Sequence, residues 1–315
     1  MGFNKFLSQL NIFSQCKKYG LPFWQCPQLL FVVTGMAIAV VSVTVYLLGT
    51  RYVVDPAVAG LIALLVTAFL FIVNFIIIRS LERMAEASRL KSEFISVVSH
   101  QLRSPLSNLK WSAEILQSGK LGKIEGKQLE YVKIITENTQ RMAELVSDLL
   151  VVARIEQGRL LFKKTEFSLV KTVEEIIAKY KPYAAASNIA VKLETENSSS
   201  SVVADLSQIK SVVENLLDNA IRYSRGRGDV SIKIRGEGKG LVFEIKDKGV
   251  GIPQEDQKHI FQKFFRSANA LKHQTEGTGL GLYIARSIIE KSGGKMGFSS
   301  REGKGSTFWF ILPIK

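Results

Sequence analysis

The stretch EFISVVSHQLRSPLSNLKW (residues 93–111) decides how this chain is interpreted. At about 100° per residue, its apolar side chains gather on one face of a helix, a face that includes Phe94, Leu102 and Leu109. His100 lies about 180° from the centre of that face, so we expect an exposed imidazole and not a core histidine. Pro105 follows in what is otherwise helix interior, where proline removes a backbone hydrogen bond at a cost of about 3 kcal/mol. A neutral imidazole on a helix surface is a suitable nucleophile near neutral pH.

Two amphipathic helical patterns make up this part of the chain. The first contains His100 and runs to about residue 116, and the second runs from residue 128 to about residue 156. SGKLGKIEGK (residues 118–127) separates them with three glycines. The sequence therefore predicts an antiparallel helical hairpin over residues 92–158. Its apolar face needs a partner, so we expect a homodimer that forms a four-helix bundle.

Two apolar runs precede the hairpin, at residues 29–49 and 57–78. Each has about the 20 residues that a helix needs to cross a bilayer, and neither contains Asp, Glu, Lys, Arg or His. Basic residues flank both runs on their outer sides, and only TRYVVDP (residues 50–56) lies between them. The positive-inside rule therefore predicts a multi-pass protein of the cell membrane with both termini cytoplasmic, although Arg51 in the turn argues weakly against this. We divide this region into a cytoplasmic N-terminal segment (1–28), a transmembrane hairpin (29–78) and a linker helix (79–91).

The composition is basic, with 42 Lys and Arg against 28 Asp and Glu and a net charge of +14. Such an excess suits anionic membrane lipid or a phosphate-bearing ligand. The basic residues are scattered and no nucleic-acid-binding motif accompanies them, so we expect no nucleic-acid partner. The two cysteines, Cys16 and Cys26, match neither a zinc spacing nor a disulfide framework.

From residue 166 to residue 315 the pattern changes to short alternating segments. IAVKLETE, DVSIKIRG, GLVFEIKDK, KMGFSSREG and STFWFILP alternate apolar and polar residues as strands do, and helical patterns at residues 206–223 and 282–292 lie among them. Helices mixed with a largely antiparallel sheet predict an α/β two-layer sandwich. We expect the SSSS run (residues 198–201) to be a loop between strands.

Three segments of this domain carry residues suited to a phosphate ligand. Asn215 and Asn219 share one side of a helix, where they could offer oxygens to Mg²⁺ and amide donors to phosphate, although the spacing alone favours ordinary surface asparagines. DKGVGIP (residues 247–253) could place the Asp247 carboxylate on an exocyclic amine, or be a simple surface turn. GTGLGLYIARSII (residues 277–289) places glycines at the start of a helix, where backbone N–H groups favour phosphate.

SHQLRSPLSNLK resembles the H-box of sensor histidine kinases, whose usual form is S-H-E-L-R-T-P-L. The resemblance implies that His100 accepts the phosphoryl group and that Gln101, Arg103 and Ser104 are its catalytic neighbours. The family has Glu or Asp at the position of Gln101, and Thr or Asn at that of Ser104. An amide cannot accept a proton as a carboxylate does, so we expect slow autophosphorylation, and the phosphatase activity of the family is in greater doubt.

The three segments of the second domain resemble the N, G1 and G2 boxes of the Bergerat-type ATP-binding fold of histidine kinases, gyrase and Hsp90, and IFQKFFR (residues 260–266) resembles the F-box. The resemblance implies ATP and Mg²⁺ as cofactors, with Asn219 on Mg²⁺, Asp247 on adenine, and residues 267–276 as a mobile lid. The implied nucleotide-binding residues are Asn215, Asn219, Arg222, Tyr223, Asp247, Gly249, Gly251, Phe261, Phe264, Arg266, Gly277, Thr278, Gly279, Leu280 and Gly281.

Taken together, these resemblances imply a membrane-anchored sensor histidine kinase that phosphorylates His100 with ATP. The phosphoryl group then passes to an aspartate in the receiver domain of a response regulator. Gln101 keeps open a nucleotide-binding pseudokinase or membrane scaffold. A gyrase-like ATPase is a weaker alternative, because that family has a glutamate where Asn215 stands. With so short a turn outside, the signal enters through the membrane pair, a membrane sensor partner or the N-terminal segment. The stimulus, the cognate regulator and the cis or trans direction of transfer are not encoded in any motif of the sequence.

Overall fold

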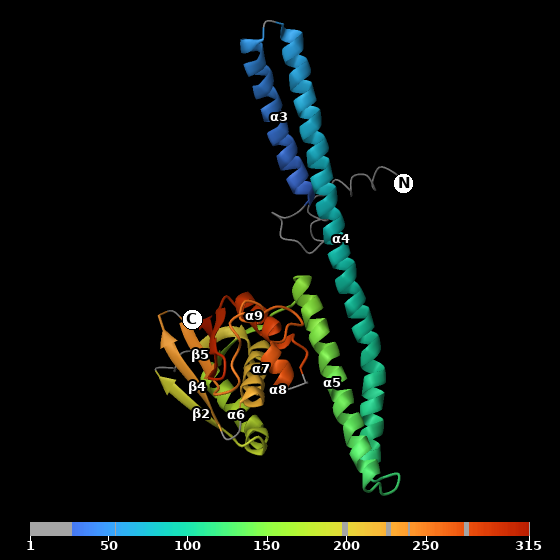
Figure 1. Ribbon diagram of the computed structural model, residues 1–315, viewed down its shortest axis with the longest axis vertical. Coiled ribbons are helices and arrows are strands. Elements are labelled where there is room, and N and C mark those ends of the chain that lie inside the picture. The colour runs from blue at the N-terminus through green and yellow to red at the C-terminus, as the bar shows by residue number, and fades with distance from the viewer. Residues whose placement is uncertain are drawn as a thin grey trace. The chain divides into compact units, whose positions relative to one another are not determined.

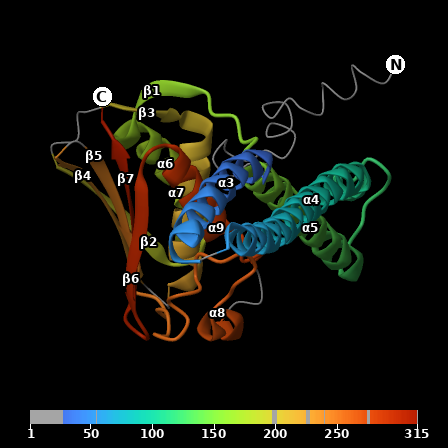
Figure 2. The same cartoon turned by 90° about the horizontal axis from the view of Figure 1, so that it is seen from above.

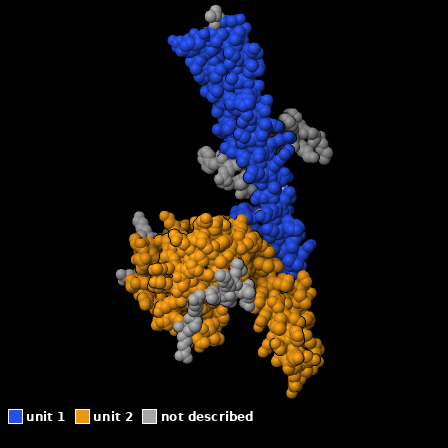
Figure 3. Space-filling model, viewed as in Figure 1, with its two compact units in different colours: residues 1–104, 153–160 blue, residues 105–152, 161–315 orange. Residues whose placement is uncertain are grey.

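The computed structural model describes residues 27–53, 55–196, 201–224, 228–238, 240–273 and 277–314. The chain divides into two compact units, one of residues 1–104 with 153–160 and the other of residues 105–152 with 161–315 (Figure 3). Cys16 and Cys26, with most of the predicted N-terminal segment, lie outside the described residues.

Two long apolar helices open the described chain, α3 (Pro27–Tyr52) and α4 (Pro56–Gln117; Figure 1). Both are long and apolar enough to cross a membrane, a property that core helices and signal sequences share. Helix α4 continues without a break for 62 residues, through the predicted linker and past His100 and Pro105. The sequence predicts this continuity because RSLERMAEASRLKSEF (residues 79–94) contains neither Gly nor Pro.

Polar side chains join α3 to α4 within the apolar runs. Thr34 Oγ1 donates a hydrogen bond to Asn74 Oδ1 (2.8 Å), and Thr67 Oγ1 donates one to Ser42 Oγ (2.6 Å). The buried Asn74 thus faces α3. Side chains on the outward faces of both helices are apolar and exposed, among them Met36, Leu64 and Phe69.

Helix α5 (Lys127–Glu156) pairs with the last part of α4 as a helical hairpin. Lys110 Nζ donates a hydrogen bond to Gln140 Oε1 (3.1 Å), and Gln117 Nε2 donates one to Thr136 Oγ1 (3.0 Å). The predicted hairpin is therefore confirmed. Part of its apolar surface stays exposed in one chain, at Leu109, Leu116, Ile135, Met142 and Leu145.

The C-terminal region is a two-layer α/β domain, as the sequence predicts. Its five-stranded sheet has the order β2 (Ile189–Glu196), β4 (Gly228–Glu237), β5 (Gly240–Lys246), β7 (Gly305–Pro313) and β6 (Lys295–Arg301). Strands β2 and β4 are parallel and the other neighbours are antiparallel. One face of the sheet is covered by α6 (Leu169–Ala186), α7 (Leu206–Tyr223) and α9 (Gly281–Lys291; Figure 2). The short helix α8 (Ala268–His273) falls within the predicted lid.

The structure contains a second, two-stranded sheet that the sequence does not predict. Strand β1 (Lys164–Ser168) pairs antiparallel with β3 (Ser201–Asp205). The prediction of a loop over residues 198–201 is therefore wrong at Ser201, while the preceding serines lie outside the described residues. Both strands have five residues, and β1 is largely exposed, so no alternation of apolar and polar residues marks it.

The core lies between the helices and the larger sheet. Phe243 of β5 stacks on Phe310 of β7 with ring centroids 4.8 Å apart, and Leu216, Leu217 and Ile288 are fully buried against this sheet. Asp205 caps α7 by accepting hydrogen bonds from the backbone of Ser207 (3.0 Å) and Gln208 (3.2 Å). Because α7 buries its apolar face, its polar face is fixed in direction, and that face carries the candidate site.

Candidate functional site

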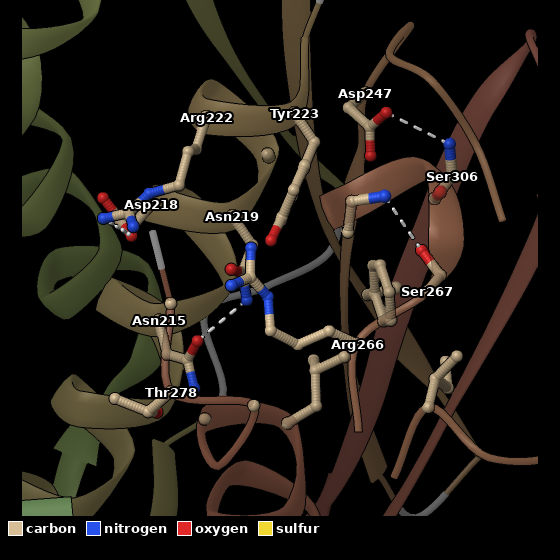
Figure 4. Close-up of a pocket in the computed structure, with 18 of the residues that line it drawn as sticks. Asn215, Asp218, Asn219, Arg222, Tyr223, Asp247, Arg266, Ser267, Thr278 and Ser306 are labelled. Atoms are coloured by element: carbon tan, nitrogen blue, oxygen red, sulfur yellow. Dashed lines mark hydrogen bonds and ion pairs between the residues drawn. The ribbon is translucent and has the colours of Figure 1, made fainter. Parts of the chain in front are cut away.

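Helix α7 brings two amides together. Asn219 Nδ2 donates a hydrogen bond to Asn215 Oδ1 one turn earlier (2.8 Å; Figure 4). The bond uses the amide nitrogen of Asn219, which makes its Oδ1 oxygen the atom able to ligate a hard cation such as Mg²⁺.

The glycine segment that leads into α9 packs closely against this pair. A Cβ atom on Gly281 would lie 2.5 Å from Asn215 Nδ2 and 2.7 Å from Asn215 Oδ1, so a side chain at this position would displace the Asn215 amide. Thr278 Oγ1 accepts a hydrogen bond from the backbone of Leu280 (3.2 Å), which shapes the turn before the helix. The start of α9 therefore presents backbone N–H groups beside the two amides, an arrangement that favours phosphate.

Asp247 follows the last residue of β5 and is buried. Its Oδ1 oxygen accepts hydrogen bonds from the backbone N–H groups of Gly249 (2.8 Å) and Ser306 (3.2 Å; Figure 4). Burial raises the pKa of this carboxyl group, although the backbone donors lower it in part. Since both backbone bonds fall on Oδ1, the Oδ2 oxygen is left to accept a hydrogen bond from a ligand, as recognition of an exocyclic amine requires.

Two arginines lie near the amides, and they differ in direction. Arg222 Nη2 forms an ion pair with Asp218 Oδ2 one turn earlier on α7 (2.8 Å). The side chain of Arg266 extends toward Asn219 (Figure 4). Arg266 is thus directed at the amides of Asn215 and Asn219, whereas the guanidinium of Arg222 is held by its ion pair with Asp218.

These groups surround a cavity of about 520 Å³. Its size is in the range of small-molecule and cofactor sites. Most of the residues predicted to bind nucleotide line it: Asn215, Asn219, Arg222, Tyr223, Asp247, Gly251, Arg266, Gly277, Thr278, Gly279 and Gly281.

The other predicted residues lie behind the wall or outside it. Leu280 is fully buried in the core, and Gly249 supports Asp247 through its backbone. Phe261 packs edge-on against Phe298 with ring centroids 5.8 Å apart, and Phe264 is exposed. A direct contact of these four residues with nucleotide stays a prediction.

Much of the cavity wall was not foreseen from the sequence. Its apolar part includes Ile252, Ile260, Phe265, Ile284 and Phe308. Tyr180 of α6 also lines it, and burial together with the nearby Asp218 carboxylate raises the pKa of this phenol to about 12. Ile260 and Phe265 belong to the quoted IFQKFFR segment, but Tyr180 and Phe308 come from distant segments without any local signal.

Two acidic residues of α5, Glu144 and Asp148, complete one end of the cavity. Thr278 Oγ1 donates a hydrogen bond to Asp148 Oδ2 (3.0 Å). Burial raises the pKa of the Asp148 carboxyl group beyond the opposite effect of this bond. Acidic residues on an amphipathic helix are commonly solvated, so no local pattern distinguishes these two from the others on α5.

His100 is exposed on α4, which confirms the prediction from helical periodicity. Its neighbours Gln101, Arg103 and Ser104 are exposed as well, while Leu106 is buried.

No cluster of three or more His, Cys, Asp or Glu side chains suited to a metal occurs among the residues that the structure describes. Mg²⁺ bound through nucleotide phosphates, water and one amide oxygen needs no such cluster. The donor set around Asn219 fits that type of ion.

Two family models match the chain. The model described as "His Kinase A (phospho-acceptor) domain" matches residues 90–158, and the one described as "Histidine kinase-, DNA gyrase B-, and HSP90-like ATPase" matches residues 204–315. The chain is 31% identical over 229 residues to the circadian input-output histidine kinase CikA of Synechococcus elongatus, an alignment that covers 72% of this chain and 30% of CikA. The chain spans between 25% and 40% of the length of such curated relatives.

Solved structures agree with the fold. Full-length ShkA in complex with AMPPNP has a TM-score of 0.60 at 24% identity, covering 70% of this chain and 46% of ShkA. The histidine kinase ThkA in complex with the response regulator protein TrrA has a TM-score of 0.52 at 27% identity, covering 74% of this chain and 66% of ThkA. With a matched phospho-acceptor domain, a matched ATPase domain and named kinases among its relatives, the chain belongs to the sensor histidine kinases of two-component systems.

Proposed function

We propose that this chain is a membrane-anchored kinase that transfers the γ-phosphoryl group of ATP to His100 and then to an aspartate of a response regulator. One observation carries the proposal: Asn215, Asn219, Asp247 and the glycine segment converge on one cavity inside the matched ATPase domain. The matched phospho-acceptor domain precedes it in the chain and contains an exposed histidine.

In this proposal each part of the cavity binds one part of ATP. Asp247 Oδ2 accepts a hydrogen bond from the exocyclic amine of adenine, and the apolar wall contacts the ring. The backbone N–H groups at the start of α9 and the Arg266 guanidinium bind the phosphates. Mg²⁺ held by Asn219 Oδ1 would neutralise phosphate charge and fix the phosphate orientation.

The transfer step moves one phosphoryl group. A ring nitrogen of His100 forms a bond to the γ-phosphorus while the bond to the β–γ bridging oxygen breaks, and ADP leaves with the electron pair. The proton on the other ring nitrogen must be stabilised or accepted. Gln101 can accept a hydrogen bond from that N–H through its carbonyl oxygen, but as a neutral amide it does not take the proton. Autophosphorylation is therefore slow relative to a chain with a carboxylate at this position.

The apolar helices support membrane anchoring in the proposal. Their outward apolar side chains are exposed, and their polar contacts, such as Thr34 with Asn74, face inward. A cytoplasmic position of both termini is supported by Lys5, Lys17 and Lys18 before α3 and by Arg79 and Arg83 after the apolar part of α4.

The helical hairpin supports the proposal of a homodimer. Leu102, Leu109 and Leu116 are exposed on one face of α4, about 180° from His100. A second copy covers this face in a four-helix bundle and leaves both histidines accessible. The receiver domain of a response regulator is the proposed phosphate acceptor, and the relative ThkA has been solved with such a protein.

A nucleotide-binding scaffold without transfer is the second candidate, and Gln101 is the observation that favours it. Incubation of the full chain in detergent or nanodiscs with γ-labelled ATP and Mg²⁺ separates the two. We expect label on the protein that is lost in acid and retained in alkali, as a phosphohistidine is. Binding of ATP without any protein-bound label would contradict kinase activity and favour the scaffold.

A further inference from the structure

The backbone of Phe264 adopts a conformation that bulky residues disfavour. Its φ angle is 62°, in the left-handed region. Among the residues that the structure describes, the other non-glycine residue with positive φ is Asn188 (57°), which follows the C-cap of α6. Asparagine tolerates that region because its short side chain forms local hydrogen bonds, whereas phenylalanine has no such compensation.

The turn at Phe264 is fastened to the glycine segment of the cavity. The backbone N–H of Phe264 donates a hydrogen bond to Gly279 O (3.0 Å). Gly279 itself has a φ of 68°, and a Cβ atom there would lie 2.7 Å from the carbonyl carbon of Phe264. Two left-handed residues therefore pack backbone to backbone, and they hold Phe264 at the side of the cavity where phosphate is proposed to bind.

The ring of Phe264 is not used by the core of its own domain. The residue is 61% exposed, while Phe261 packs against Phe298 and Phe265 lines the cavity. Within the described part of residues 164–314, no other large apolar side chain is as exposed; Tyr183 follows at 41%. A disfavoured backbone that displays an apolar ring is a common sign of a functional constraint.

Helix α4 offers a complementary surface beside His100. At about 100° per residue, Val97 lies about 60° and Trp111 about 20° around the helix from His100. Val97 is 52% exposed and Trp111 is 66% exposed. These side chains are on the face of His100 and not on the leucine face opposite, so the proposed dimer core does not cover them.

We infer that Phe264 is a positioning residue, which docks the ATP-binding domain onto the apolar side chains of α4 that flank His100 during phosphorylation. The inference rests on the proposed function. Transfer requires the γ-phosphate to come within about 3–3.5 Å of the imidazole nitrogen, so the phosphate side of the cavity must face α4 in the reactive state. Phe264 is fixed at that side, and it therefore meets α4 when the cavity does. In this inference Phe264 acts through orientation, in place of the direct contact with nucleotide that the F-box resemblance implies, and it does not touch the reacting nitrogen.

The test compares Phe264→Asn and Phe264→Leu in the full chain. Asparagine keeps the left-handed turn and removes the ring, so we expect the melting temperature to be equal or higher and the KM for ATP to stay within about twofold. The kcat of autophosphorylation should fall by about tenfold or more, because a lost anchor misplaces the reacting groups. Phe264→Leu keeps an apolar side chain and should retain most of the kcat. Val203→Thr, a conservative change at an exposed apolar residue of β3, is the matched control and should leave both constants unchanged.

Trp111→Ser combined with Phe264→Asn identifies the surface that Phe264 meets. If the two side chains dock together, the loss of kcat in the double variant is smaller than the product of the two single losses. A Phe264→Asn chain that keeps the parental kcat, with or without a raised KM, would overturn the inference. A second double variant combines Phe264→Asn with Val97→Ser. If the losses of kcat multiply fully in both double variants, the inference is also overturned. A parent chain that never incorporates phosphate would contradict the proposed function, and the inference with it.

Discussion

Replacing Asp247 by asparagine changes one atom of the proposed adenine contact and keeps the local fold. The Oδ1 oxygen, which accepts hydrogen bonds from Gly249 N (2.8 Å) and Ser306 N (3.2 Å), is retained in the amide. The Oδ2 oxygen becomes an NH₂ group. An acceptor that faces the exocyclic amine of adenine is thus exchanged for a donor, and two donors then meet in a buried place.

The magnitude follows from the loss of a hydrogen bond to a charged, buried group. Such a bond contributes about 1.5–3 kcal/mol. At about 1.4 kcal/mol for each factor of ten, ATP should bind about 10- to 150-fold more weakly to Asp247→Asn. Inosine triphosphate carries an oxygen in place of the exocyclic amine, so its affinity should rise or stay constant and the preference for ATP should be lost.

Isothermal titration with ATP and with inosine triphosphate measures both affinities. Asp229→Asn is the matched control, because it makes the same exchange at a solvent-exposed carboxylate that pairs with Lys192. An unchanged ratio of ATP to inosine triphosphate affinity in Asp247→Asn, with the fold intact, would refute the assignment of Asp247 to adenine.

Three further predictions concern the same residues and their neighbours. Burial raises the pKa of Asp247 above its ordinary 3.8, so the folded chain binds this proton more tightly than the unfolded chain. As the pH rises from about 4 through the raised pKa, the free energy of unfolding of the parent should therefore fall relative to that of Asp247→Asn. Urea unfolding of both chains across this pH range measures the difference. A gain in the stability of the parent relative to the variant would contradict the prediction. Gly281→Ala should cost about 1–3 kcal/mol in ATP binding or in stability, because its Cβ would lie 2.5 Å from Asn215 Nδ2. Titration with ATP and thermal unfolding measure the loss. Adding Asn215→Ser to the same chain should recover part of it. Gln101→Glu should raise the initial rate of autophosphorylation by a factor on the order of 10², the lower end of general base catalysis; an equal or lower rate would remove Gln101 from proton handling.

Elements with a strong local pattern could be predicted from the sequence. Helix α7 and strand β2 have the predicted bounds. A regular apolar period marks both elements, and the capping Asp205 marks the start of α7. Strands β1 and β3 could not be predicted, since five-residue strands stabilised by each other carry little period of their own. The exposure of His100 depended only on the helical period, and so it was predicted correctly.

The candidate site divides in the same way. Asn215, Asn219 and Asp247 stand in recognisable motifs, whereas Phe308 and Tyr180 reach the cavity through tertiary packing that no local pattern encodes. The second backbone donor to Asp247 comes from Ser306 on β7, which only the pairing of β5 with β7 brings close. The left-handed backbone of Phe264 likewise depends on its contact with Gly279 and is invisible in the IFQKFFR segment.

The central claim is that the phosphoryl group of ATP comes to rest on His100. The most direct measurement is the amount of acid-labile phosphate per chain after incubation with γ-labelled ATP and Mg²⁺, for the parent and for His100→Gln. His100 is exposed on α4, so its replacement by glutamine should leave the fold and the affinity for ATP unchanged. We expect label on the parent and none on His100→Gln, with equal binding of ATP. Label that persists in the variant would contradict the account.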